Sequence, residues 1–154
     1  MLKAKYEALK NYLIESGEAT AEELTEELTA VYNEGWETFE ILGNEYKVFT
    51  DEEADSATAE NIKDSLWAFN ADFILKHTAV YEETTDREDA EIIKALRMVQ
   101  GSICESANAL VKALIVDIDA FIEDAVDADG RGHFLATYDG EENESGDFYI
   151  YRTN

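Results

Sequence analysis

The stretch with the clearest potential for chemistry is DADGRGH, residues 127–133. A calcium-binding loop places oxygen ligands at its first, third and fifth positions, glycine at the sixth and glutamate at the twelfth. With Gly130 at the sixth position, the third and fifth are aspartates, but Ala125 and Ala136 occupy the first and last. We therefore predict a turn here and no metal site, with Gly130 and Gly132 supplying positive φ angles.

No other arrangement of residues points to catalysis. His133 lacks a His or Cys partner at zinc-binding spacing, and His77 is the only other histidine. Cys104 follows Ile103 on an apolar helix face, which predicts a buried, inert thiol. Carboxylates are so numerous that no pair stands out as an acid and a base, and no nucleophile-elbow motif is present. We predict no catalytic residue, no metal and no cofactor, and an enzyme is the least favoured class.

Charge restricts the possible partners. The chain has 154 residues, and 36 acidic against 12 basic residues give it a net charge of -24. Direct binding to nucleic acid or to an anionic membrane needs clustered Lys and Arg, so both are excluded. A single cysteine forms no internal disulfide, and the start of the chain lacks the apolar block of a signal peptide. We expect a cytoplasmic protein.

The N-terminal segment has helical periodicity. Apolar residues at helical spacing predict a first helix that Gly17 ends. Thr20 and Glu23 have the form of a capping box, which predicts a second helix reaching Val31. We expect these two helices to form an antiparallel pair.

Three further helices are expected in the middle of the chain. Thr50 and Glu53 repeat the capping-box pattern and open a long helix that continues to Ile74. Periodic apolar residues then resume at residues 92–99 and 103–122. Gly101 between them either kinks one long helix or separates two.

Two β-hairpins complete the predicted fold. Apolar residues alternate in residues 36–41 and 46–48 around a Gly43-Asn44 turn. A second hairpin is expected from residues 133–138 and 147–152, with an acidic loop between them as an additional contact surface. About five helices packed with two hairpins give an α+β protein, which we expect to be a single compact domain over residues 1–154. Arg131 and Arg152 are expected to pair with nearby carboxylates in structural roles.

The acidic residues fall into runs. From residue 15 to residue 60 there are fifteen carboxylates and one base, Lys47. Residues 117–129 and 139–147 hold two further runs. Carboxylates three or four residues apart on a helix lie about 5 to 6 Å apart, which is comparable to phosphate spacing along a nucleic-acid strand. The residues that we predict to replace phosphates are Glu22, Glu23, Glu26, Glu27, Asp51, Glu52, Glu53 and Asp55.

This pattern favours a DNA mimic that blocks the basic groove of a nucleic-acid-binding protein. Neutralising Glu22, Glu23, Glu26 and Glu27 is then expected to abolish inhibition. Two alternatives stay open: an acidic interaction module that acts by shape, and adaptation to high salt. The eight lysines and the concentration of acid into runs weigh against salt adaptation.

Two segments carry a resemblance to known proteins. They are TDEEADSATAENIKDSLWAFNADFI, from Thr50 to Ile74, and DADGRGHFLATYDGEENESGDFYIYRTN, from Asp127 to Asn154. Both resemble segments of small acidic bacteriophage proteins that have no assigned activity. The resemblance implies a phage context, in which small acidic proteins include inhibitors of restriction and CRISPR enzymes. It therefore also implies the cytoplasm of a bacterial host cell as the location and a basic nucleic-acid-binding host protein as the partner. It supplies no site residues and no target.

Overall fold

The computed structural model describes residues 1–25, 30–33 and 36–154. Its described part contains both helices and an antiparallel sheet, so the predicted α+β class is confirmed. In chain order, the elements are α1 (Leu2–Glu15), η1 (Glu23–Thr25), β1 (Ala30–Asn33), β2 (Trp36–Ile41), β3 (Asn44–Phe49), α2 (Asp51–Asp64), η2 (Leu66–Ala68), α3 (Ala71–Lys76), α4 (Asp86–Ile103), η3 (Cys104–Ala107), α5 (Asn108–Leu114), α6 (Ile118–Leu135), β4 (Asn143–Ser145) and β5 (Phe148–Arg152).

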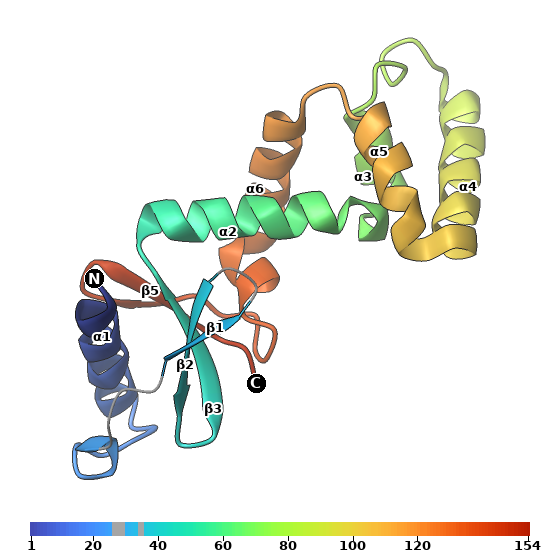
Figure 1. Cartoon of the computed structure of the whole chain (residues 1–154). Helices are drawn as coiled ribbons and strands as arrows, with labels where there is room; N and C mark the ends of the chain where they lie inside the picture. Colours follow the sequence, from blue (N-terminus) through green and yellow to red (C-terminus); the bar gives the residue numbers. More distant parts are fainter. Residues whose placement is uncertain (26–29, 34–35) are drawn as a thin grey trace. The chain divides into compact units, whose positions relative to one another are not determined.

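Contacts divide the chain into two compact units. We call residues 1–58 with 129–154 the sheet unit, and residues 59–128 the helical unit. Figure 1 shows that all strands belong to the first and that the second consists of helices and their connections. The expectation of a single domain stays a prediction.

The sheet has five strands in the order β1-β2-β3-β5-β4, with every neighbouring pair antiparallel. The predicted first hairpin is confirmed, with Phe39 opposite Tyr46, but its loop is Leu42-Gly43 and not Gly43-Asn44, because Asn44 already pairs with Ile41. Gly43 has a φ of 79°, a value that glycine reaches without a steric penalty. Consecutive side chains alternate between the two faces of a strand, so this sheet has two surfaces to cover.

Helix α1 covers one face of the sheet. Leu9 and Leu13 of α1 are buried against Phe39, Tyr46 and Ile150 from three strands. The leucines recur at helical spacing and the strand residues alternate, because each set of side chains must point into this shared core.

The opposite face is covered by the first turns of α2 and the end of α6. Phe49 and Tyr151, from adjacent strands, pack with Ala54 and Ala57 of α2 and with Leu135. Small residues on α2 let its backbone approach the aromatic rings closely. This second core cluster brings the start of α2 next to the residues that follow Gly130.

The predicted second helix and its antiparallel pairing with the first are wrong over the described residues. The capping box itself is present, because the Thr20 amide donates to Glu23 at 2.9 Å and the Glu23 amide donates to Thr20 Oγ1 at 3.4 Å. However, only the short turn η1 follows it, and residues 30–33 form β1 beside β2. Val31 and Tyr32 are types that favour strands when a partner strand is available, as β2 is here.

The second predicted hairpin exists with a different first strand. Residues 143–145, not 133–138, pair with β5. Residues 131–135 continue α6 after a break at Gly130, whose φ is 77° as predicted. The prediction for Gly132 is wrong, since its φ is not positive and the residue is instead packed tightly against residues 140–142. A short apolar run such as Phe134 to Ala136 does not by itself distinguish helix from strand.

The helical unit corrects three further expectations. The long helix predicted to reach Ile74 breaks after Asp64 into η2 and α3. Gly101 neither kinks nor separates helices, because it lies within α4. That helix ends at Ile103, and the next residue, Cys104, has a φ of 48°. Cys104 is exposed, not buried, and so is Ile103.

Candidate functional site

Arg131 is the centre of an ion-pair cluster in the sheet unit, which we call the Arg131 cluster: Arg131, Asp51, Asp55 and Glu142. Its Nη1 lies 2.7 Å from Asp51 Oδ1 and 2.8 Å from Asp55 Oδ1, and its Nε lies 2.8 Å from Glu142 Oε2. The guanidinium also lies 4.4 Å from the centre of the Tyr149 ring. The predicted pairing of Arg131 with nearby carboxylates is confirmed. The predicted pairing of Arg152 is confirmed too, since its Nη1 lies 3.9 Å from Glu18 Oε2.

The electrostatics of this cluster favour its charged form. Burial disfavours the Arg131 cation, but hydrogen bonds to Glu142, Asp51 and Asp55 outweigh burial and raise the pKa of the guanidinium. The Tyr151 hydroxyl donates to Glu142, and burial together with this bond raises the pKa of Tyr151. Two of the predicted phosphate substitutes, Asp51 and Asp55, are therefore already paired with a cation, although both remain exposed.

Glu53 forms an ion pair with Lys5 inside the sheet unit. Its carboxylate lies 2.7 Å from the ammonium of Lys5, whose side chain is only 4% exposed. Lys5 also lies 3.9 Å from Glu37 and 5.9 Å from the centre of the Phe49 ring. A buried ammonium needs such a partner, because leaving it unpaired is strongly unfavourable. Within the predicted group on α2, Glu52 is the carboxylate that is exposed and has no ion pair in the described part of the chain.

The pair formed by Lys5 and Glu53 predicts a loss of stability in acid. Partial burial raises the pKa of Glu53, but hydrogen bonds from Lys5 and from the Thr50 amide bring it below the ordinary 4.5. A carboxyl group with a lowered folded pKa stabilises the fold above its unfolded pKa, and this contribution disappears as pH falls through the folded value. We expect the free energy of unfolding to decrease below pH 4.5 and Glu53→Gln to reduce that slope, measured by urea unfolding across this range.

The matched control is Glu52→Gln, which removes an exposed carboxylate from the same turn of α2. It is expected to leave the slope close to that of the unchanged protein. If Glu52→Gln and Glu53→Gln give the same dependence on pH, the Lys5 pair does not stabilise the fold as argued.

The predicted row on the second helix is not formed as expected. Glu22 and Glu23 are exposed and lie at a turn, and Glu23 accepts hydrogen bonds from Thr20 that lower its pKa. Glu26 and Glu27 lie outside the described residues. The described part of this segment thus supplies two exposed carboxylates without the continuous helix that would align them.

A regular row of carboxylates instead lies on α6, in the helical unit. Asp119, Glu123 and Asp127 are spaced by four residues, and all three are exposed; we call them the α6 row. Side chains four apart lie on one face of a helix, at separations of about 5 to 6 Å. Within the residues that the structure describes, none of the three forms an ion pair. The sequence contains no Lys or Arg between Lys112 and Arg131.

The start of α6 is fixed by its own acidic residue. Asp117 Oδ1 accepts hydrogen bonds of 3.1 Å from the amides of Asp119 and Ala120. Such a cap fixes the first residue of the helix and therefore which face carries the row. The acidic run at residues 117–129 is visible in the sequence. The α6 row was not predicted from it, because the helix expected over residues 103–122 starts earlier than α6 does.

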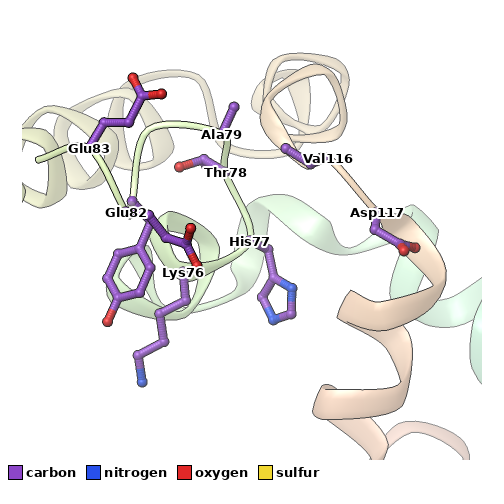
Figure 2. Close-up of a pocket in the computed structure, with 9 residues that line it drawn as sticks. Lys76, His77, Thr78, Ala79, Glu82, Glu83, Val116 and Asp117 are labelled. Atoms are coloured by element: carbon purple, nitrogen blue, oxygen red, sulfur yellow. The ribbon is translucent and has the colours of Figure 1, made fainter.

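A pocket of about 350 Å³ lies beside His77 in the same unit (Figure 2). The imidazole Nε2 lies 3.2 Å from Asp124 Oδ2, and the ring contacts Phe73 and Phe121 at about 5 Å between centres. Figure 2 shows His77 and Lys76 projecting to one side of the loop, with Glu83 on the other.

Hydrogen bonds around this pocket hold the loop in place. The Val116 amide donates to the carbonyl of His77 at 2.9 Å, and the Thr78 hydroxyl donates to the carbonyl of Leu75 at 2.7 Å. A carboxylate that orients an imidazole is a feature of general-base sites. Here the one hydroxyl beside His77 in sequence, that of Thr78, is committed to the backbone. We therefore interpret the pair of His77 and Asp124 as a tie between α6 and the residue that follows α3.

The described part of the chain contains neither a cluster of potential metal ligands nor a membrane-spanning helix. No group of three or more His, Cys, Asp or Glu side chains there could hold a metal ion. His133 is exposed and contacts the ring of Phe134. None of the helices described is both long enough and apolar enough to span a bilayer.

Comparisons of the chain with protein-family models, with curated proteins and with solved structures find no match.

Proposed function

We propose that the chain is an acidic inhibitor of phage type, of the anti-CRISPR or anti-restriction kind. It occupies a basic nucleic-acid-binding surface of a host defence enzyme in place of nucleic acid. The observation that carries the proposal is the α6 row, three exposed carboxylates at one helical spacing without a cation to neutralise them in the described structure. A row of this kind offers a basic groove negative charges at spacings comparable to those of phosphates.

Energetics support a partner of opposite charge. Neighbouring like charges on a helix cost a few tenths of a kcal/mol per pair, and a cationic surface removes that cost on binding. The helical unit has 15 acidic and 6 basic residues, and the sheet unit has 21 and 6. Both units are therefore acidic, with net charges of -9 and -15, and a field of this size accelerates association with basic proteins.

The earlier group of predicted residues has a smaller part in this proposal. Glu52 is exposed and unpaired in the described structure, so it remains available to a partner. Asp51 and Asp55 are exposed but share Arg131, which reduces the charge that they present. Glu53 neutralises Lys5, and we leave it out of the proposed surface.

Neutralising the α6 row is expected to weaken binding to the basic partner. The variant Asp119→Asn, Glu123→Gln, Asp127→Asn keeps side-chain size and removes three negative charges. If each charge contributes about 1 kcal/mol, affinity falls by about a hundredfold or more. Titration of the captured partner against the variant measures this loss, and a thermal scan shows whether the fold is kept.

The matched control removes three charges that do not form a row. Glu7→Gln, Glu15→Gln, Glu40→Gln changes three exposed residues of the sheet unit and alters net charge by the same amount. We expect the affinity of this control for the partner to fall by no more than about tenfold, through weaker long-range attraction alone. Equal losses in the two variants would show that net charge, and not the α6 row, is recognised.

A further inference from the structure

A second pocket in the helical unit has a chemistry opposite to that of the acidic surface. It is wide open to solvent and has a volume of about 390 Å³. One wall is the loop that contains Trp67, Phe69 and Asn70, and the other is the C-terminal half of α4 with Arg97 and Gly101. We call it the Arg97 pocket.

The loop wall is held in a fixed position by two side chains. Gln100 Nε2 donates to the carbonyls of Trp67 and Phe69, both at 2.7 Å. Asn108 accepts from the Trp67 amide at 3.1 Å and donates to the carbonyl of Lys63 at 2.8 Å. The loop is thus cross-linked to α4 and α5, so little ordering remains to be done on binding.

Arg97 is the cationic group of this pocket. It is exposed, and within the described residues it forms no ion pair, whereas Arg131 and Arg152 each contact carboxylates. An arginine that stays unpaired in a chain with 36 acidic residues is available to an external anion. A guanidinium binds carboxylates and phosphates through two parallel hydrogen bonds.

The rest of the wall favours a flat apolar group. Trp67 and Phe69 are half-buried, and Phe69 is fixed by ring contacts with Phe73 and Phe121 at 5.7 and 5.0 Å. Gly101 leaves the α4 side open, because a Cβ added there meets no atom within 4 Å. Glycine inside a helix is less favourable than alanine, and the open space that it leaves in the pocket is a reason to retain it.

We propose that the Arg97 pocket binds a small molecule in which a carboxylate or phosphate is attached to a flat aromatic ring. Arg97 pairs with the anionic group, and the ring lies against Trp67 and Phe69. The side-chain amide of Asn70, which does not cap α3, is available as a further donor. A bare anion does not suffice, because the net charge of -24 opposes it and only ring burial offsets that repulsion.

The proposal is tested by titrating the full chain with phenyl phosphate and with benzoate. The readout is the indole N–H signal of Trp67 in a two-dimensional NMR spectrum, assigned with Trp36→Phe. We expect a saturable shift of the Trp67 signal, with the Trp36 signal unchanged. Inorganic phosphate has the anionic group without the ring, and benzyl alcohol has the ring without the anionic group. Both are expected to bind at least about tenfold more weakly. The stronger of the two aromatic anions identifies the preferred anionic group.

Two variants locate the site independently. Arg97→Gln is expected to lower the affinity for phenyl phosphate about tenfold, while Arg87→Gln on the same helix leaves that affinity unchanged. Gly101→Leu, which improves helix propensity and fills the pocket, is expected to abolish the shift of the Trp67 signal. A shift that does not saturate, or one that benzyl alcohol reproduces equally, would overturn the proposal. So would full binding by Gly101→Leu, which decides the question even if Arg97→Gln fails to fold.

Discussion

Replacing Gly132 by alanine is expected to destabilise the protein by about 3 kcal/mol. A Cβ at this position would lie 2.4 Å from the carbonyl oxygen of Gly140, 2.8 Å from the Glu142 amide and 2.9 Å from the carbonyl carbon of Glu141. All three are backbone atoms, so no side-chain rotation relieves the contact. The change in urea midpoint measures the loss.

Gly101→Ala is the matched control for this substitution. Both glycines lie in helices and neither has a positive φ, but the added Cβ at Gly101 meets no neighbour within 4 Å. Alanine there is expected to stabilise the protein by about 0.5–1 kcal/mol through its higher helix propensity. If Gly132→Ala unfolds at the same urea concentration as Gly101→Ala, the close packing around Gly132 does not exist in solution.

Arg131→Gln is expected to cost about 3 kcal/mol. The guanidinium side chain is 12% exposed and holds three carboxylates, so its loss leaves Asp51, Asp55 and Glu142 facing one another. Glu142 is the least exposed of the three and should account for about 2 kcal/mol. Asp51 and Asp55 are mostly solvated and contribute about 0.5 kcal/mol each.

Two further variants separate charge from geometry at Arg131. Arg131→Lys keeps the charge but loses the planar fork, so about half of the stability is expected to remain. Arg87→Gln removes an exposed arginine that has no ion pair in the described chain and is expected to change stability by less than about 0.5 kcal/mol. Chemical unfolding of all three proteins provides the test. Equal midpoints for Arg131→Gln and Arg87→Gln would show that the Arg131 cluster is energetically neutral.

Local signals in the sequence predicted the start of α2 and the first hairpin. The capping boxes at Thr20 and Thr50 are both present, because such boxes depend only on residues three apart. The hairpin around Gly43 follows from a turn that needs a positive φ. These features are set by neighbouring residues, so a single sequence contains the information.

Features that depend on distant partners were not predictable in the same way. Residues 30–33 form a strand because β2 lies beside them. A capping box indicates where a helix begins, but not how many residues it contains. The exposure of Cys104 follows from the end of α4 at that residue, which no glycine or proline marks. The environment of Gly132 arises from residues 140–142, which the helical periodicity of α6 does not reveal.

The same distinction applies to the candidate surface. The excess of acid and its division into runs are properties of the sequence alone. The sequence alone does not reveal which carboxylates are neutralised within the protein. Glu53 pairs with Lys5 from α1, and Asp51 pairs with Arg131 from the end of α6. The α6 row became apparent only once the cap at Asp117 fixed the helix start.

The measurement that tests the central claim most directly is capture of bacterial lysate proteins on the immobilised chain, with elution by a salt series and by added duplex DNA. Mimicry predicts that nucleases or other DNA-binding proteins are retained, that duplex DNA displaces them, and that rising salt releases them as counterions replace the carboxylates. Capture must also weaken in the variant that lacks the α6 row. Retention of a partner that neither DNA nor salt displaces would contradict mimicry and would indicate recognition by shape.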